Sequence, residues 1–173
     1  MKIYINPGHG TPDPGAVNPV TGLQEKDVCF AVGNLAADYL RAAGYEVIVD
    51  QSDHLTGVIN RANASGADLF VSIHCNSFGD PRANGTETIY YPGSAQGKKL
   101  AECIQKQLIG EFGLTDRGIK QMGNTLGVLT QTTMTAVLAE LAFISNATEE
   151  HLLAMEQDRW AKAIARGISD YFA

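Results

Sequence analysis

Apolar residues recur along the chain with two alternating spacings. Short apolar runs typical of strands occur at residues 2–6, 46–49, 69–75, 86–91, 126–130 and 136–143. Apolar residues three and four positions apart predict helices over residues 26–43, 56–64, 94–112 and from 148 towards the C-terminus. Strands that alternate with helices of this length indicate an α/β fold. We therefore expect a three-layer domain with a mostly parallel, twisted sheet of about six strands and helices on both faces.

The length and composition of the chain suit one such domain. Its 173 residues lie within the usual size range of a domain, and 45% hydrophobic residues with 18% charged residues are ordinary for a protein with one core. We therefore expect residues 1–173 to form a single catalytic domain. The formal net charge of -6 disfavours nucleic acid as a partner, because an acidic surface repels phosphates.

The sequence contains no segment that resembles a membrane span or a signal peptide. No apolar run approaches the roughly 20 residues of a membrane span, so we expect no membrane span. The apolar stretch at residues 3–5 is too short for the core of a signal peptide. Either the chain was trimmed, or the protein is released by a route that needs no such signal.

Four ionisable side chains occur where an α/β sheet forms its ligand sites. His9 follows the first strand, Glu25 begins the first long helix, His74 ends a buried strand and Glu140 interrupts another. Ligand sites in such sheets form outside the carboxyl ends of the strands, so the four groups can converge at one edge. Taken singly, a histidine after a strand is commonly a surface residue, and a glutamate at a helix start stabilises the helix dipole. Glu140 fits no such alternative well, because burying an uncompensated carboxylate costs several kcal/mol.

Two imidazoles and one carboxylate suit a divalent metal of borderline softness, and zinc is the obvious candidate. We predict that His9, Glu25 and His74 hold one Zn²⁺ ion, which leaves a fourth position for water. Glu140 would then take a proton from that water and pass it to the leaving amine. This arrangement predicts a metal-dependent hydrolase.

The three cysteines, Cys29, Cys75 and Cys103, are widely spaced and form no C-x-x-C pair, so a disulfide framework or a cysteine zinc site is not expected. Cys75 follows His74 directly and suggests a cysteine nucleophile as an alternative. Neighbouring side chains on a strand point to opposite faces, so we expect Cys75 to face away from the site. All three cysteines are predicted to be reduced packing residues.

Several short motifs occur in a fixed order along nearly the whole chain. They are Pro7-Gly8-His9-Gly10, Gly15-Ala16, Glu25-Lys26-Asp27, Arg61 with Asn63, Ser72-Ile73-His74-Cys75-Asn76, Gly85-Thr86-Glu87, Asp116-Arg117-Gly118 and the segment at 140–146. Together they resemble the zinc-dependent N-acetylmuramoyl-L-alanine amidases, the peptidoglycan-cleaving family of bacterial cell-wall enzymes and phage endolysins. The resemblance implies His9, Glu25 and His74 as metal ligands and Glu140 as the catalytic carboxylate. It also implies that peptidoglycan is the partner, cleaved at the amide bond between the lactyl group of N-acetylmuramic acid and the L-alanine of the stem peptide.

Three further residues bear on substrate and metal binding. Where the family commonly has an acidic residue, this chain has Asn6; if that acid orients the metal-binding histidine, Asn6 could do so through its carbonyl oxygen, less strongly. Arg117 could grip a carboxylate of the stem peptide, with a surface arginine as the equal alternative. Asn76 could hydrogen-bond near the metal or simply end its strand.

Two other functions remain open at this point. One is a peptidoglycan-binding or regulatory homologue with a decayed active site, against which the retention of all four groups argues. The other is a metallopeptidase or another amidohydrolase that acts on a different amide. A nucleotide-binding protein is disfavoured, because Gly8-His9-Gly10 lacks the further glycine of the dinucleotide motif.

Overall fold

The computed structural model describes residues 1–123 and 125–173. Six strands in these ranges form one sheet. They are β1 (Lys2–Pro7), β2 (Glu46–Val49), β3 (Leu69–Asn76), β4 (Thr86–Tyr90), β5 (Asp116–Gln121) and β6 (Thr135–Phe143). Their order across the sheet is β2-β1-β3-β6-β4-β5. All neighbouring strands are parallel except β4 and β6, which are antiparallel, so the expected mostly parallel sheet is confirmed.

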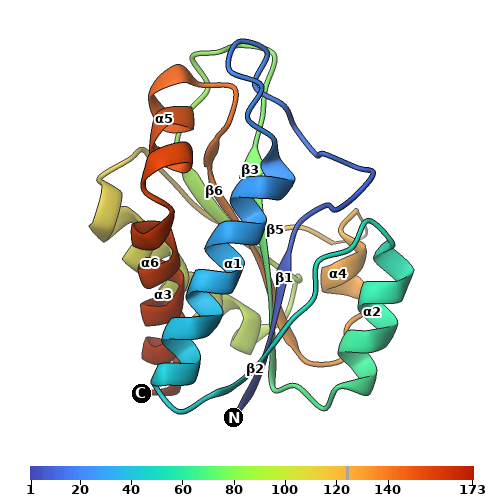
Figure 1. Ribbon diagram of the computed structural model, residues 1–173. Coiled ribbons are helices and arrows are strands. Elements are labelled where there is room, and N and C mark those ends of the chain that lie inside the picture. The colour runs from blue at the N-terminus through green and yellow to red at the C-terminus, as the bar shows by residue number, and fades with distance from the viewer. Residues whose placement is uncertain (124) are drawn as a thin grey trace.

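Helices cover both faces of this sheet, as expected (Figure 1). They are α1 (Glu25–Ala42), α2 (Leu55–Ala64), α3 (Ala95–Phe112), α4 (Gly127–Thr130), α5 (Ala147–Met155) and α6 (Gln157–Phe172). Figure 1 shows α1, α3 and α6 on one side of the sheet and α2 and α4 on the other. Among the described residues, no helix combines the length and apolar character needed to cross a membrane.

Side chains alternate between the two faces and build two separate cores. On the face of α1, α3 and α6, β3 contributes Val71 and Ile73, which are buried together with Trp160 of α6. On the opposite face, Phe70 of β3 and Leu138 of β6 pack with the short helices α2 and α4. His74 and Glu140 have the same parity in their strands as these last two residues. They therefore lie on the face that the short helices cover.

One sequence-based expectation was wrong, and one strand was missed. The apolar run at residues 126–130 does not form a strand, because Gly127–Thr130 is the helical turn α4 with Val128 and Leu129 buried. A short apolar run has the same periodicity in a buried strand and in a buried turn of helix. Conversely, β5 has the polar sequence Asp-Arg-Gly-Ile-Lys-Gln and lies at the edge of the sheet, so it lacks the alternation that predicts a strand.

Candidate metal centre and catalytic site

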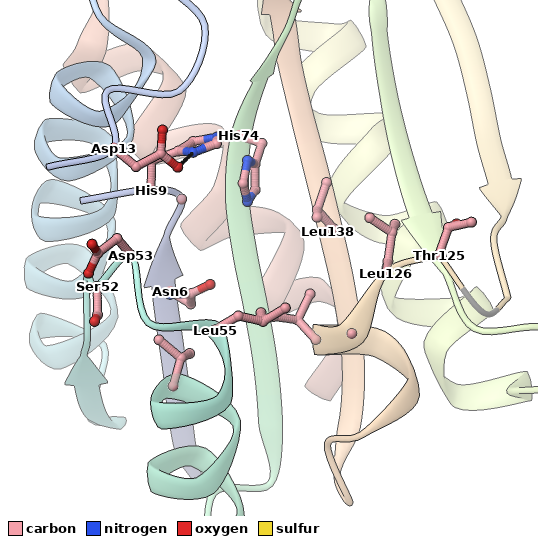
Figure 2. Close-up of a pocket in the computed structure, with 14 residues that line it drawn as sticks. Asn6, His9, Asp13, Ser52, Asp53, Leu55, His74, Thr125, Leu126 and Leu138 are labelled. Atoms are coloured by element: carbon pink, nitrogen blue, oxygen red, sulfur yellow. Dashed lines mark hydrogen bonds and ion pairs between the residues drawn. The ribbon is translucent and has the colours of Figure 1, made fainter. Parts of the chain in front are cut away.

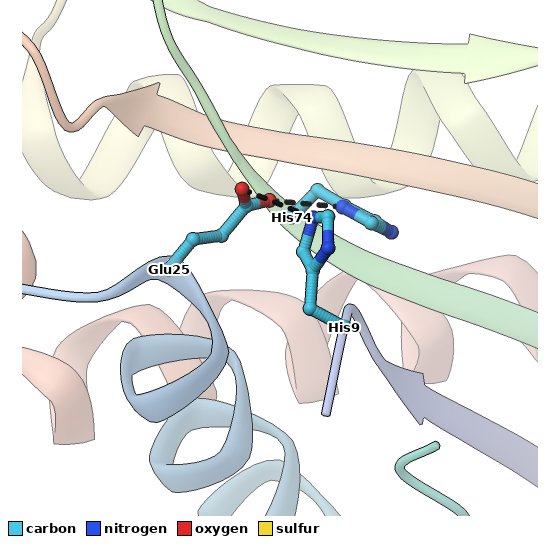
Figure 3. A group of neighbouring side chains, drawn as sticks. All are labelled: His9, Glu25 and His74. Atoms are coloured by element: carbon cyan, nitrogen blue, oxygen red, sulfur yellow. Dashed lines mark hydrogen bonds and ion pairs between the residues drawn. The ribbon is translucent and has the colours of Figure 1, made fainter. Parts of the chain in front are cut away.

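The three predicted metal ligands come together at the carboxyl edge of the sheet (Figure 3). His9 follows β1, Glu25 is the first residue of α1 and His74 is near the end of β3. One ligand atom from each residue lies within 4.8 Å of the other two. His9 Nε2 is 3.1 Å from Glu25 Oε2, and His74 Nδ1 is 2.9 Å from Glu25 Oε1. The three side chains thus present two nitrogens and a carboxylate to one small region of space.

Two glycines let the backbone approach this cluster closely. A Cβ at Gly8 would lie 2.4 Å from His74 Cε1, and a Cβ at Gly15 would lie 2.5 Å from His9 Cδ2 and 2.6 Å from Glu25 Oε2. Gly15 also has a φ of 66°, a conformation that glycine adopts without cost. His9 has a φ of 62°, which is uncommon for a residue with a side chain and is typical of functional sites. The backbone therefore passes close to the side chains of both histidines, at positions where a larger residue than glycine would clash with them.

The cluster holds an ionised carboxylate between two imidazoles. A hydrogen bond with Glu25 raises the pKa of His9 from 6.5 to about 9 against the opposing effect of burial, and Asp13 adds to the rise. Burial by itself would raise the pKa of Glu25, but hydrogen bonds with His74 and His9 hold it below its usual range. Glu25 is therefore an ionised carboxylate that is only 5% exposed. This carboxylate and the two imidazoles match the donor set that zinc takes in proteins.

Asp13, and not Asn6, contacts the far nitrogen of His9. Asp13 Oδ2 is 2.7 Å from His9 Nδ1, and Asp13 Oδ1 accepts a hydrogen bond of 2.9 Å from the Gly15 backbone N–H. The Asn6 amide instead donates to the Asp50 carbonyl, and its oxygen accepts from the Ser72 hydroxyl. Asn6 therefore does not take the place of an orienting acid, because its polar atoms are used inside the sheet. The signal for Asp13 was an acid four residues after His9 in a loop that turns back on itself.

Glu140 lies beside the cluster in the centre of the sheet. It is opposite His74 in the pairing of β3 with β6, and opposite Glu87 in the pairing of β4 with β6. Its Oε2 atom is shielded from solvent and has no hydrogen-bond partner within residues 1–123 and 125–173. Burial raises the pKa of Glu140 to about 7, the charges of Glu25 and Glu87 add to the rise, and His74 opposes it. A carboxyl group of this kind can both accept and release a proton near neutral pH.

Arg117 and Asn76 line one hollow of about 330 Å³ together with Phe78, Ala83, Glu87 and Phe143, which we call the arginine pocket. Arg117 Nε donates to Glu87 Oε2 over 2.8 Å, and Asn76 Nδ2 donates to Glu87 Oε1 over 3.2 Å. The Arg117 guanidinium also lies over the Phe143 ring, 5.0 Å from its centroid. The structure thus fixes Arg117 and Asn76 against a shared carboxylate. The role of Glu87 as that partner was not predicted from the sequence.

Comparison with known proteins places the chain in a family. The profile of the N-acetylmuramoyl-L-alanine amidases matches residues 3–170. This chain belongs to the N-acetylmuramoyl-L-alanine amidase family. Enzymes of this family hydrolyse an amide bond in the peptidoglycan of the cell wall.

The similarity to known proteins extends over almost the whole amidase chain. YqiI of Bacillus subtilis (strain 168) is 40% identical over 98% of this chain and 84% of YqiI. The N-acetylmuramoyl-L-alanine amidase LytC of the same organism is 36% identical over 98% of this chain, which spans only 35% of LytC. The crystal structure of an N-acetylmuramoyl-L-alanine amidase from Clostridium difficile 630 matches with a TM-score of 0.92 and 31% identity, covering 99% of this chain and 96% of that one.

A second hollow of the amidase adjoins both histidines (Figure 2). It has a volume of about 250 Å³, and we call it the histidine pocket. Figure 2 shows Leu138 of β6 beside the ring of His74, Leu126 before α4 beyond it and Leu55 of α2 below, and all three line the pocket. The cluster of His9, Glu25 and His74 therefore borders a largely apolar hollow on the face of the sheet that α2 and α4 cover.

The cysteines of the amidase lie apart from this chemistry. Cys75 is buried in the core beneath α1, where its thiol contacts that of Cys29. Its backbone N–H donates to Glu25 Oε1 over 3.0 Å, so only its main chain borders the cluster. The expectation that Cys75 faces away from the site is confirmed, and all three cysteines are free thiols.

Proposed function

We propose that this amidase uses one zinc ion, held by His9, Glu25 and His74, to hydrolyse the amide bond between N-acetylmuramic acid and L-alanine in peptidoglycan. The observation that carries the proposal is the convergence of the three ligand atoms within 4.8 Å. Two imidazoles and a carboxylate are a common catalytic zinc set, with one position left for a small ligand. A bound zinc ion supplies a Lewis acid that polarises a carbonyl and activates water.

Glu140 is the proposed proton carrier. Its shielded Oε2 atom makes no hydrogen bond to any described residue, and its pKa of about 7 suits both halves of a proton transfer. The carboxylate takes a proton from the attacking water and then gives it to the nitrogen of the leaving L-alanine. The position of Glu140 opposite His74 supports this role, because it places the carboxylate next to the ligand cluster.

Asp13 is the proposed orienting group for His9. A carboxylate 2.7 Å from Nδ1 favours the tautomer with its proton on that nitrogen. In the neutral ring, the lone pair of Nε2 then faces Glu25 and is available to a metal. Such carboxylate–histidine pairs commonly accompany zinc ligands.

Residues 1–173 are proposed to act as one catalytic domain, with Arg117 and Asn76 in contact with the stem peptide. Guanidinium groups bind carboxylates through two parallel hydrogen bonds, and stem peptides carry carboxylates. The fixed position of Arg117 against Glu87 and Phe143 supports a binding role over that of a loose surface arginine.

Zinc analysis combined with digestion of purified cell walls tests this function. We expect about one zinc per chain, and fragments whose new ends are the lactyl carboxyl group of muramic acid and the amino group of L-alanine, both identified by mass spectrometry. New ends between two amino acids would indicate a metallopeptidase. A protein that binds walls without cutting them would indicate a decayed homologue; the intact ligand set and the family match favour neither.

A further inference from the structure

The ionisable side chains of the site form a row across four adjacent strands. His74 of β3 is opposite Glu140 of β6, and Glu140 is opposite Glu87 of β4. Glu87 is in turn hydrogen-bonded to Arg117 of β5. The row therefore runs from the proposed metal ligands at one end, past Glu140, to Arg117 at the other end.

Beyond its two histidines, the described lining of the histidine pocket offers no cationic side chain to a carboxylate. Apart from the two histidines, the ionisable residues in its described lining are Asp13 and Asp53, both acidic. The rest of the lining is largely apolar, with Leu55, Leu126 and Leu138 as its main side chains. A neutral ligand with apolar surface, such as an acetylated sugar with its lactyl group, suits this pocket better than a peptide that carries carboxylates.

The arginine pocket has the opposite preference. The Arg117 side chain is 38% exposed, and its Nε and Nη1 atoms bond to Glu87 and to the Asn84 carbonyl. Its Nη2 atom makes no hydrogen bond to the residues that the structure describes, so one edge of the guanidinium can donate hydrogen bonds to a ligand carboxylate. Glu87 neutralises part of the charge of Arg117 and holds its guanidinium group in place. A group with a single carboxylate fits here.

The proposed reaction implies the same orientation of the substrate along this row. On the proposed function, Glu140 protonates the nitrogen of the broken bond, so this nitrogen must lie on the Glu140 side of the ligand cluster. The substituent on the nitrogen then continues along the row towards Glu87 and Arg117. The acyl group stays on the side of His9 and His74, next to the histidine pocket.

We propose that the amidase binds its substrate in this one direction. The muramoyl part occupies the histidine pocket and contacts Leu55, and the stem peptide occupies the arginine pocket with a carboxylate of its second residue on Arg117. This inference rests on the proposed function and adds the determinants of specificity on each side of the bond.

Three soluble probes test the assignment: N-acetylmuramoyl-L-Ala-D-Glu, the same compound with both carboxyl groups amidated, and lactoyl-L-Ala-D-Glu without the sugar. For Arg117→Gln we expect kcat/KM on the first probe to fall about tenfold and on the amidated probe to change little. For Leu55→Ala we expect a fall of about fivefold on the first probe and a much smaller one on the sugar-free probe. Leu55 is 49% exposed, so its replacement leaves the core intact.

Arg82→Gln is the matched control for Arg117, because Arg82 is an exposed arginine that pairs with Asp80 outside both pockets. It should leave kcat/KM unchanged on all three probes. The inference is overturned if Arg117→Gln lowers kcat/KM equally on the first probe and on its amidated form. It is also overturned if the roles are exchanged, so that Leu55→Ala changes the ratio of kcat/KM between the acidic and amidated probes and Arg117→Gln changes the ratio between the probes with and without the sugar. If the wild-type enzyme cleaves none of the probes and no wall peptidoglycan, the proposed function itself fails.

Discussion

Replacing Asp13 by asparagine tests how the loop after β1 prepares His9 for a metal. Asp13→Asn keeps the size of the side chain but removes the charge that lies 2.7 Å from His9 Nδ1. The change has two opposing effects on zinc affinity. It loosens the orientation and lowers the basicity of His9, and it also weakens proton binding to the same ring, since Asp13 contributes to the raised pKa.

The pKa of His9 separates these two effects. Zinc binds the neutral imidazole, so below the pKa of about 9 a proton competes with the metal. At pH 7 this competition lowers the apparent zinc affinity of the wild type about 100-fold, and the affinity should rise about tenfold per pH unit up to pH 9. Above pH 9 the competition disappears. There, Asp13→Asn should bind zinc about 10- to 100-fold more weakly than the wild type, which is the usual effect of losing such a partner.

Zinc affinity can be measured by competition with a chelator between pH 6.5 and 9.5, together with calorimetry in buffers of different ionisation enthalpy to count released protons. The wild type should release about one proton from His9 at pH 7. Asp53→Asn is the control, because Asp53 lines the same pocket without a contact to His9. Equal affinities of Asp13→Asn and the wild type at pH 9.5 would refute the role of Asp13, and a pH-independent wild-type affinity would refute proton competition at His9.

Three further outcomes follow from the same geometry. Glu140→Gln should retain zinc in metal analysis but lower kcat on peptidoglycan by about 10²- to 10⁴-fold, since the amide cannot carry a proton; loss of the metal would mean that Glu140 is a ligand. Gly15→Ala should lower the free energy of unfolding by about 1–3 kcal/mol and weaken zinc binding, because its Cβ would meet His9 and Glu25. Gly22→Ala is the control in chemical denaturation: it shares a positive φ of 77° but has nothing within 4 Å, so equal zinc affinity of the two variants would contradict the steric argument. The metal-free protein should lose stability as pH rises from 6.5 to 9, because the raised pKa of His9 stabilises the fold fully below 6.5 and no longer above 9. Thermal unfolding in chelator measures this loss, and a His9→Gln variant that shows the same pH dependence would assign it to another group.

Much of the fold was predictable because its central elements are strongly apolar. β3 and β6 are buried on both faces and read as continuous apolar runs, and α1 and α3 carry clear helical spacing. The polar edge strand β5 and the single turn α4 lack such signals, and their conformations depend on neighbours that are distant in the sequence.

The convergence of His9, Glu25, His74 and Glu140 was predictable for a related reason. Each is an ionisable residue at the end of a regular element or inside an apolar one, and the edge of a parallel sheet brings such positions together. Asp13 and Glu87 were missed because their importance depends on their partners. The contact of Asp13 requires the turn of the loop at residues 10–15, and the contacts of Glu87 require the register of β4 against β6.

The reversed direction of β4 relative to β6 has a consequence for how such an enzyme can change its substrate range. The beginnings of β4 and β5 lie at the same edge as the ends of β3 and β6, so the connections at residues 77–85 and 113–115 both reach the rim of the arginine pocket or the loops beside it. None of these residues supplies a candidate metal ligand. Insertions or exchanges in the two connections can therefore reshape the surroundings of the arginine pocket while the cluster of His9, Glu25 and His74 stays as it is.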